Sequence, residues 1–262
     1  MKTISSRDNP TLKKLHGVAN SARERRKQGL TLLDGPHLLA AALDAGWPLQ
    51  AVYLAESAIG IAEIASLLAR LPAQLEPVLL PDALFAHISP VDAPSGILAA
   101  IVLPDPVAPS ADAASLLVLD GVQDPGNLGT LLRTAAAAGL GEVLLGEGCA
   151  QAWSPRALRA GMGAHFLLRI CERCDLLAAL RSYPGRVLAT ALAPASRSLY
   201  EVPLDGPVAW LFGAEGQGLS PELLQRADAT VLIPMAAGVE SLNVAAAAAI
   251  CLFEQRRQTR LG

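Results

Sequence analysis

Polar side chains are crowded near the C-terminus of the chain, where a helix is expected to begin. Glu240, Ser241 and Asn243 come directly before Val244 to Phe253, a stretch without any charged residue. Ser and Asn side chains bind the free backbone N–H groups at a helix start, so capping is their default role. The apolar pattern predicts a helix buried on nearly every side. Its polar start would then lie at the mouth of a packed core, where a small-molecule site is expected.

A second polar cluster follows the apolar run SLLVLD. Gly126 and Gly129 allow a tight turn there, and Asn127 can cap the next helix. Arg133 lies six residues after Asn127, a little under two helical turns. A guanidinium in that place can reach back to a phosphate or a ribose with its fixed fork of donors. The alternative is an ordinary capped helix with an Arg in a surface ion pair.

The third cluster is LFGAEGQGLS, residues 211–220. Gly213, Gly216 and Gly218 allow the backbone to approach a ligand closely, and Glu215 stands among them. The spacing GxxGxG is not the dinucleotide fingerprint, so a nicotinamide-dependent enzyme is disfavoured. The glycines could merely form a turn, but a carboxylate held among glycines in an apolar run favours a functional role.

Apolar runs alternate with helix patterns in this part of the chain. The runs expected as strands are SLLVLD, EVLLG, FLLRI, RVLATAL, VAWLF and TVLIPM. Strands that are apolar on both faces and separated by helices belong to a parallel sheet covered on both sides. Ligands of such sheets bind at the C-terminal ends of the strands, and each polar cluster follows one of these runs.

Two domains are expected. Residues 1–103 contain short helix and strand patterns that predict a smaller α/β domain. Pro104, Pro106 and Pro109 then interrupt every period, which predicts an extended linker over residues 104–114. Residues 115–262 form the second domain, an α/β parallel sheet.

Charge is divided unevenly along the chain. Residues 1–30 contain eight basic and two acidic side chains, although the whole chain has a net charge of −3. A basic segment on an acidic protein predicts contact with phosphates. A solvated amphipathic helix without a partner is the alternative. The candidate RNA-binding residues are Arg7, Lys13, Lys14, Arg23, Arg25, Arg26 and Lys27.

Composition points to a cytoplasmic protein without a membrane span or a signal peptide. Four cysteines are too few for a disulfide framework in a chain of 262 residues. Cys171 and Cys174 form a CxxC pair, but no second CxxC or His pair accompanies it, so no metal is expected. Two unrelated thiols are favoured over a redox pair or half of a zinc site.

In order and spacing, the three polar clusters resemble the three signature motifs of the SpoU/TrmH family of RNA ribose 2′-O-methyltransferases, within the SPOUT superfamily. The resemblance covers the whole second domain. In residues 1–103, SSRDNPTLKKLHGVANSARERRKQGLTLLDGPHLL and SPVDAPSGILAAI also resemble the small substrate-binding domain, related to ribosomal proteins, that many members carry in front.

The resemblance implies a trefoil-knotted domain in which the chain passes through its own loop before the last helix. S-adenosylmethionine would bind in the knot, in a pocket formed by Gly213, Ile233, Leu242, Ala191, Leu192 and Met235. Arg133 would contact the target ribose or its neighbouring phosphate. The residues that would shape the site are Asn127, Glu215, Ser241 and Asn243. Members are typically homodimers in which one subunit completes the site of the other.

The function implied is methylation of a ribose 2′-hydroxyl, with ribosomal RNA of the 23S type as the favoured substrate. A tRNA methyltransferase is one alternative. A catalytically idle RNA-binding protein of the same fold is another. The layout also occurs in resistance enzymes of antibiotic producers, and the sequence does not separate these from housekeeping members.

Overall fold

The computed structural model describes residues 1–110 and 114–260, and the chain divides into two compact units. Unit 1 comprises Met1–Asp105 and Trp153–Phe166, and unit 2 comprises Pro106–Ala152 and Leu167–Gly262. Residues 153–166, which the sequence analysis places in the second domain, therefore fold with the first unit. Residues 111–113 of the expected linker lie outside the described residues.

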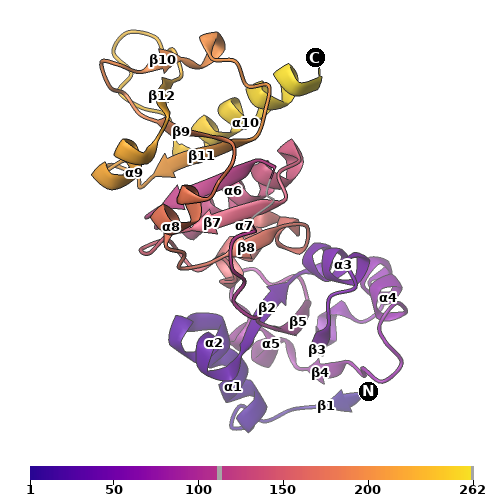
Figure 1. Cartoon of the computed structure of the whole chain (residues 1–262). Helices are drawn as coiled ribbons and strands as arrows, with labels where there is room; N and C mark the ends of the chain where they lie inside the picture. The colour runs from indigo at the N-terminus through magenta and orange to yellow at the C-terminus, as the bar shows by residue number, and fades with distance from the viewer. Residues whose placement is uncertain (111–113, 261–262) are drawn as a thin grey trace. The chain divides into compact units, whose positions relative to one another are not determined.

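Unit 1 is built on a mixed sheet (Figure 1). Its described strands have the order β1-β4-β3-β5-β2, in which β5 runs antiparallel to both β3 and β2. The interior strand β5 is fully buried over Ile97 to Ile101, which explains its continuous apolar sequence. The strands are β1 (Lys2–Thr3), β2 (Leu30–Asp34), β3 (Leu49–Ala55), β4 (Val78–Leu80) and β5 (Ile97–Val102). The helices are α1 (Pro10–Asn20), α2 (Ala22–Gln28), α3 (Pro36–Asp44), η1 (Glu56–Ala58), α4 (Ala62–Leu68), α5 (Asp82–Ile88), α7 (Pro155–Gly161) and η2 (Ala164–Phe166).

An aromatic cluster holds residues 153–166 in unit 1. The indole ring of Trp47 stacks on that of Trp153 with 5.3 Å between centroids, and Phe166 lies 5.3 Å from Trp47. The hydroxyl of Thr31 donates to the carbonyl oxygen of Trp153 at 2.7 Å. Helix α7 also packs against β2. Since aromatic pairs of this kind add to ordinary area burial, the segment is an integral part of the unit 1 core.

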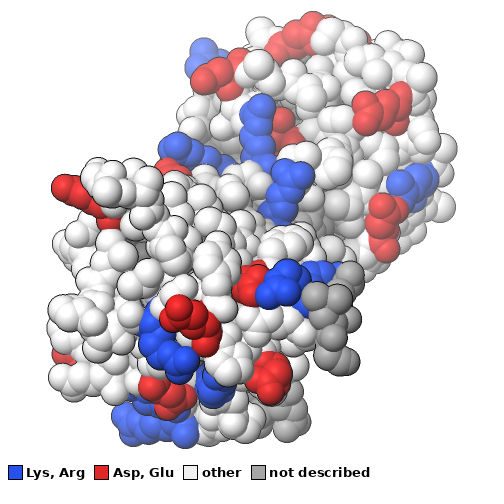
Figure 2. Space-filling view, turned by 90° about the horizontal axis from the view of Figure 1, so that it is seen from above, with Lys and Arg blue, Asp and Glu red and all other residues white. Residues whose placement is uncertain are grey.

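The basic side chains of residues 1–30 lie in the segment before α1, on α1 and on α2. All the candidate RNA-binding residues are exposed except one. Arg25 is buried, at 8% exposure, and its guanidinium donates to the carbonyl oxygens of Val18 and Ala19 at 3.0 and 3.4 Å. The expectation that Arg25 faces RNA is therefore wrong, because this side chain satisfies free carbonyls at the end of α1. On the face drawn in Figure 2, basic and acidic side chains are interspersed.

Unit 2 contains a parallel sheet, as expected. In its described residues the strand order is β10-β12-β9-β11-β6-β7-β8, with every pairing parallel. The strands are β6 (Leu116–Asp120), β7 (Glu142–Leu145), β8 (Arg169–Cys171), β9 (Arg186–Thr190), β10 (Arg197–Ser198), β11 (Val208–Gly213) and β12 (Ala229–Leu232). The helices are α6 (Pro125–Ala138), α8 (Leu176–Arg181), η3 (Leu199–Glu201), α9 (Pro221–Arg226) and α10 (Val244–Arg260).

The central strands of unit 2 are covered on both faces. Alternate residues of a strand point to opposite faces. Ala209 and Leu211 of β11 belong to one buried cluster with Leu176 of α8 and Leu223 of α9. Trp210 points the other way and donates from its indole N–H to Gln255 of α10 at 2.8 Å. Helices α10 and α6 pack closely along each other (Figure 1).

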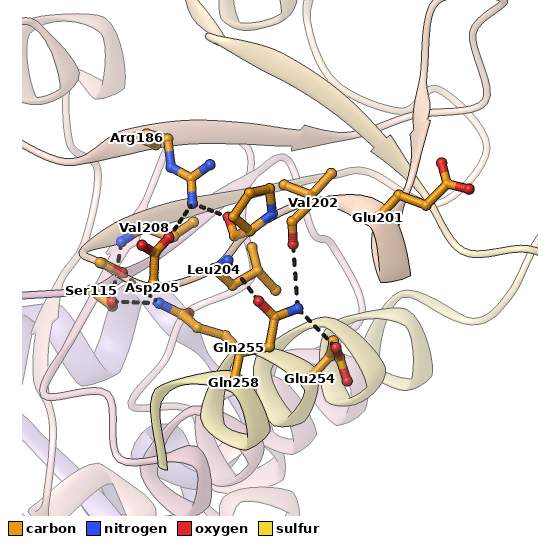
Figure 3. Close-up of polar contacts among 12 residues, drawn as sticks. Ser115, Arg186, Glu201, Val202, Leu204, Asp205, Val208, Glu254, Gln255 and Gln258 are labelled. Carbon is orange, nitrogen blue, oxygen red and sulfur yellow. Dashed lines mark hydrogen bonds and ion pairs between the residues drawn. The ribbon is translucent and has the colours of Figure 1, made fainter. Parts of the chain in front are cut away.

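Helix α10 is tied to the chain segment between β9 and β11 by two glutamines (Figure 3). Gln255 is buried, and its amide donates to the hydroxyl of Ser115 at 3.0 Å and to the carbonyl of Gly206 at 3.1 Å. Gln258 accepts from the backbone N–H of Leu204 at 2.8 Å and donates to the carbonyl of Val202 at 3.3 Å. These contacts fix where the helix lies, and therefore where its first residues are presented.

The last helix is less buried than its sequence predicts. Phe253 is 47% exposed and Ala246 is also exposed, so the expectation of burial on nearly every side is wrong. Ala245 and Ala248 are buried within unit 2. Both the exposed face and the packed face of this stretch are uncharged. The hydrophobic pattern alone therefore does not show which face is packed. Within the part of the chain that the structure describes, no helix is long and apolar enough to cross a membrane.

The Gln255 contacts predict a stability effect. The change Gln255→Ala leaves the buried indole N–H of Trp210 without its acceptor and the carbonyl of Gly206 without its donor. We expect the free energy of unfolding to fall by about 1–3 kcal/mol. Urea titration followed by circular dichroism measures this. Arg257→Gln is the comparison on the same helix, because it removes the ion pair of an exposed arginine with Glu254, and Glu254 still accepts from Gln258; it should cost about 0–1 kcal/mol. Equal losses in both variants would contradict the anchoring role of Gln255.

Candidate active site

The three polar clusters of the sequence meet at one end of the unit 2 sheet. They follow β6, β11 and β12, whose C-terminal ends lie at the same edge because the strands are parallel. A cavity of about 820 Å³ lies beside the β11 and β12 ends, a size typical of small-molecule sites. Its lining residues include all six expected cofactor residues, namely Ala191, Leu192, Gly213, Ile233, Met235 and Leu242. Glu215, Ser241 and Asn243 line it as well.

Helix α6 brings Asn127 to this edge. The cap of the helix is Asp124, whose carboxylate accepts from the backbone N–H of Asn127 at 2.8 Å. The expectation that Asn127 could be the cap is therefore wrong. Because Asp124 satisfies the helix start, the carboxamide of Asn127 is available for other partners. A sequence signal for this cap existed, since Asp124 directly precedes Pro125, a residue favoured at the first helical position.

A chain of hydrogen bonds then joins the three clusters. Asn127 donates from Nδ2 to Oε1 of Glu215 at 2.7 Å, and its Oδ1 accepts from Nδ2 of Asn243 at 3.0 Å. Oδ1 of Asn243 accepts from the backbone N–H groups of Ala245 and Ala246 at 2.9 and 3.3 Å, which caps α10 as expected. The side-chain amides of Asn127 and Asn243 thus each donate to one partner and accept from another. The order of donors and acceptors runs in one direction from the α10 start to the Glu215 carboxylate.

Residue 213 must be glycine, because the backbone of Gly218 lies too close to leave room for a side chain. A Cβ atom on this residue would lie 2.0 Å from the carbonyl carbon of Gly218. Ala214 and Gly218 exchange two backbone hydrogen bonds at 3.1 and 2.9 Å, which closes the loop that carries Glu215. Asp120 at the end of β6 fixes the far side of this loop, because its carboxylate accepts from the N–H of Ser220 at 2.8 Å. Asp120 was not predicted as a site residue, although an acid at the end of a buried strand is a usable signal.

The chemistry of the lining fits S-adenosylmethionine. The described lining contains two acids, Glu215 and Glu240, and no Lys or Arg. Carboxylates suit a ligand with a positive sulfur, whereas a dinucleotide would place its pyrophosphate among donors or cations. Apart from these acids and the uncharged polar side chains, the lining is backbone and apolar side chain, including Phe212 and Leu242. Thr190 and Gln217 also line the cavity and were not expected as site residues, and Glu240 of the third polar cluster lines it without having been assigned a role.

Arg133 is not brought into this network. It lies on α6 six residues beyond Asn127, about 9 Å further along the helix axis. Its side chain is exposed and makes no hydrogen bond or ion pair with any described residue. Ser241 is also exposed, but it lines the cavity. The structure therefore brings four of the five expected catalytic residues to one place and leaves the guanidinium outside it.

The cysteines lie away from this cavity. All four are free thiols, and the thiol of Cys171 donates to a carboxylate oxygen of the buried Glu142 at 3.4 Å. Hydrogen bonding to Cys174, burial and the nearby Glu142 raise the pKa of Cys171, whereas the bond from Cys171 lowers that of Cys174. Among residues 1–110 and 114–260, no three His, Cys, Asp or Glu side chains gather in a group able to hold a metal ion.

Comparison with known proteins agrees with this geometry. The model of the SpoU rRNA Methylase family matches residues 114–253, and that of the MRM3-like substrate binding domain matches residues 2–99. The 23S rRNA (guanosine(2553)-2′-O)-methyltransferase RlmP of Bacillus subtilis is 33% identical over 265 residues, covering 98% of this chain and 100% of the relative.

Solved structures agree over the full length. An rRNA methyltransferase from Sinorhizobium meliloti with bound AdoMet has a TM-score of 0.85 at 29% identity, over 98% of this chain and 97% of the other. An RNA 2′-O ribose methyltransferase has a TM-score of 0.84 at 32% identity, over 99% and 100%. With three motif loops joined at one cavity and both domains matched, the chain belongs to the SpoU rRNA methylase family.

Proposed function

We propose that this protein transfers a methyl group from S-adenosylmethionine to a ribose 2′-hydroxyl of ribosomal RNA, of the 23S type. The observation that carries the proposal is the hydrogen-bonded chain Glu215–Asn127–Asn243 beside a cavity without basic residues in its described lining. The relative from Bacillus subtilis, named as a 23S rRNA guanosine 2′-O-methyltransferase, supports the substrate.

The residues that would hold the cofactor are the cavity residues Ala191, Leu192, Gly213, Ile233, Met235 and Leu242. When bound, S-adenosylmethionine supplies a methyl group on a positively charged sulfur, which is already a good leaving group. Leu192 and Leu242 are 61% and 38% exposed, so they offer apolar surface that a ligand would cover. Burial of such surface is favourable by about 25 cal/mol per Å². Glu215 and Glu240 add negative charge at the edge of the cavity.

The hydrogen-bonded chain acts by positioning. Methyl transfer needs the ribose oxygen in line with the methyl group, and fixed placement of the reacting groups supplies most of the acceleration. Asn127 sets the distance between the Glu215 loop and the α10 start, where Ser241 is presented to the cavity. We assign Ser241 and Asn243 to holding substrate or cofactor, and Glu215 to fixing the amide of Asn127.

Arg133 is assigned to the developing negative charge on the ribose oxygen. A guanidinium stays protonated at ordinary pH and has no acceptor, so it stabilises charge better than it removes a proton. Phosphate or solvent would take the proton. Its exposure, and its distance from Asn127 along α6, support a role completed by a second subunit.

We therefore infer a homodimer whose α10 helices contribute to the interface. Ala246, Phe253 and Arg257 are exposed on α10 at spacings that place them on one face. Phe253 supplies an exposed aromatic surface, of a kind enriched at interfaces. A trefoil knot is part of the proposal, and the contacts of Gln255 and Gln258 with the segment between β9 and β11 support it. The reaction is assigned to the cytoplasm.

Two other functions remain as alternatives of different kinds. A tRNA substrate would leave every residue assignment unchanged. An idle RNA-binding protein of this fold would not need the cavity, the Gly213 approach or the directional amide chain. The presence of all three disfavours an idle protein, and cofactor binding separates the two possibilities.

Cofactor binding gives the first prediction of this assignment. Calorimetry should detect binding of S-adenosylmethionine to the wild-type protein, and Gly213→Ala should weaken it by at least about tenfold. A Cβ atom at 213 must displace the backbone of residues 218 and 219, and Gly218 lines the cavity. Gly141→Ala is the control, because no atom lies within 4 Å of the added Cβ. Absence of binding to the wild-type protein would favour the idle RNA-binding protein.

Arg133→Lys gives the second prediction. The smaller ammonium loses the fork geometry, so we expect the turnover number to fall by about a hundredfold while the pH profile keeps its shape. Methyl transfer to a 23S rRNA transcript over a pH series measures this. Arg181→Lys is the control, an exposed arginine at the end of α8. An unchanged rate in Arg133→Lys would remove Arg133 from the site.

Mixing variants tests the shared site. Arg133→Lys and Asn127→Ala are each expected to lose nearly all activity as homodimers. If Arg133 acts on the site of the other subunit, a mixed dimer keeps one intact site, and an equal mixture recovers about one quarter of wild-type activity. If both residues act within one subunit, the mixture stays inactive, and the assignment across subunits is wrong.

A further inference from the structure

A cluster of two histidines and an arginine lies in unit 1, outside the proposed methyl-transfer site. The imidazole rings of His16 on α1 and His87 at the end of α5 stack with 4.1 Å between centroids and 12° between planes. Nη2 of Arg7 lies 3.3 Å from Nδ1 of His87. Nδ1 of His16 lies 2.7 Å from the carbonyl oxygen of His87. Both histidines are half-buried and Arg7 is exposed.

These contacts favour one tautomer of each ring. A guanidinium only donates, so Nδ1 of His87 must be an acceptor and this ring must be neutral. A carbonyl only accepts, so Nδ1 of His16 carries a proton. The acceptor that Arg7 uses is therefore itself a titratable atom. Protonation of His87 converts that acceptor into a donor and releases Arg7.

After protonation, Nη2 of Arg7 and Nδ1 of His87 are both donors at their 3.3 Å contact, so no acceptor remains between them. An anion with several oxygens in one small group satisfies such a set, and a phosphate is one. We propose that the cluster of Arg7, His16 and His87 binds a backbone phosphate of the RNA substrate, and that His87 takes up a proton when it does so. The inference rests on the proposed RNA methylation and names a proton-coupled contact for its substrate.

The charged groups around His87 are consistent with this coupling. Loss of water contact, then His16, then Arg7 lower the pKa of His87 in the free protein. The carboxylate of Asp8 beside Arg7 is paired with Lys13 at 2.8 Å, so Lys13 neutralises it. On α2, Arg25 is directed to the carbonyls of Val18 and Ala19. At the other end of α5, Asp82 accepts from the N–H and the hydroxyl of Ser57, and β3 contributes the buried Tyr53.

The sign of the pH effect follows from these charges. A phosphate next to His87 favours the charged ring and raises its pKa, so binding takes up a proton. Affinity for RNA should then be highest at acidic pH and should fall as the pH rises through the pKa of the bound state.

The test measures RNA affinity and imidazole titration on the full chain without cofactor. The probe is a 23S rRNA transcript at constant salt. We expect the dissociation constant to rise by up to about tenfold between about pH 6 and about pH 8 in the wild-type protein. In His87→Gln the change should shrink to within about twofold. Proton NMR of the imidazole signals should show the pKa of His87 rising when a short RNA is added.

Controls make the result specific. His37→Gln removes an exposed histidine of α3 elsewhere in unit 1, so it should keep the full pH effect. Arg7→Gln changes an exposed side chain and should lose the effect even if His87→Gln does not fold. An unchanged pH effect in Arg7→Gln overturns the proposal. An equal rise in the His87 pKa with inorganic phosphate alone also overturns it, because the cluster then binds free anions. Failure of methyl transfer with a normal pH effect would refute the proposed catalysis instead.

Discussion

The structure of the site depends on the side chain of Asn127, which forms a hydrogen bond at each end of its carboxamide. The carboxamide of Asn127 has a donor end and an acceptor end, and each end is bonded to a different loop. Its partners are 88 and 116 residues away along the chain. Neither a carboxylate nor an ammonium group could replace it, because a carboxylate only accepts and an ammonium group only donates. The identity of this residue therefore decides whether the Glu215 loop and the α10 start can meet.

Other parts of unit 2 deliver the partners of Asn127. Parallel strands bring the three loops to one edge, Asp124 frees the Asn127 side chain, and the Gly213 approach closes the Glu215 loop. At the opposite end of α10, Gln255 and Gln258 hold the helix to the segment before β11. A helix that is tied at its C-terminal half presents Asn243 in one place. Positioning of this kind suits a reaction whose leaving group needs little assistance.

Much of unit 2 could be predicted from its sequence, because apolar runs between helix patterns determine a parallel sheet almost alone. The strand over FLLRI was misplaced, since Phe166 ends η2 and the strand runs from Arg169 to Cys171. The exposed face of α10 was not predicted, because an apolar residue contributes to a helical pattern whether or not it is packed. The antiparallel strand β5 was not predicted either. The place of residues 153–166 depends on Trp47 and Thr31, which are distant in sequence. Arg25 and Arg133 show the same limit for charged residues, since spacing does not reveal which arginine is buried or which partner it meets.

The most direct test of the account is the position and chemistry of the transferred methyl group. Wild-type protein and Asn127→Ala would be incubated with S-adenosylmethionine labelled in its methyl group and with unmodified 23S rRNA. Nuclease digestion and mass spectrometry would then locate the label. We expect a methyl group on one ribose 2′-oxygen, and its loss in Asn127→Ala, with the fold intact by circular dichroism. Label on a base, or full ribose methylation by Asn127→Ala, would contradict it.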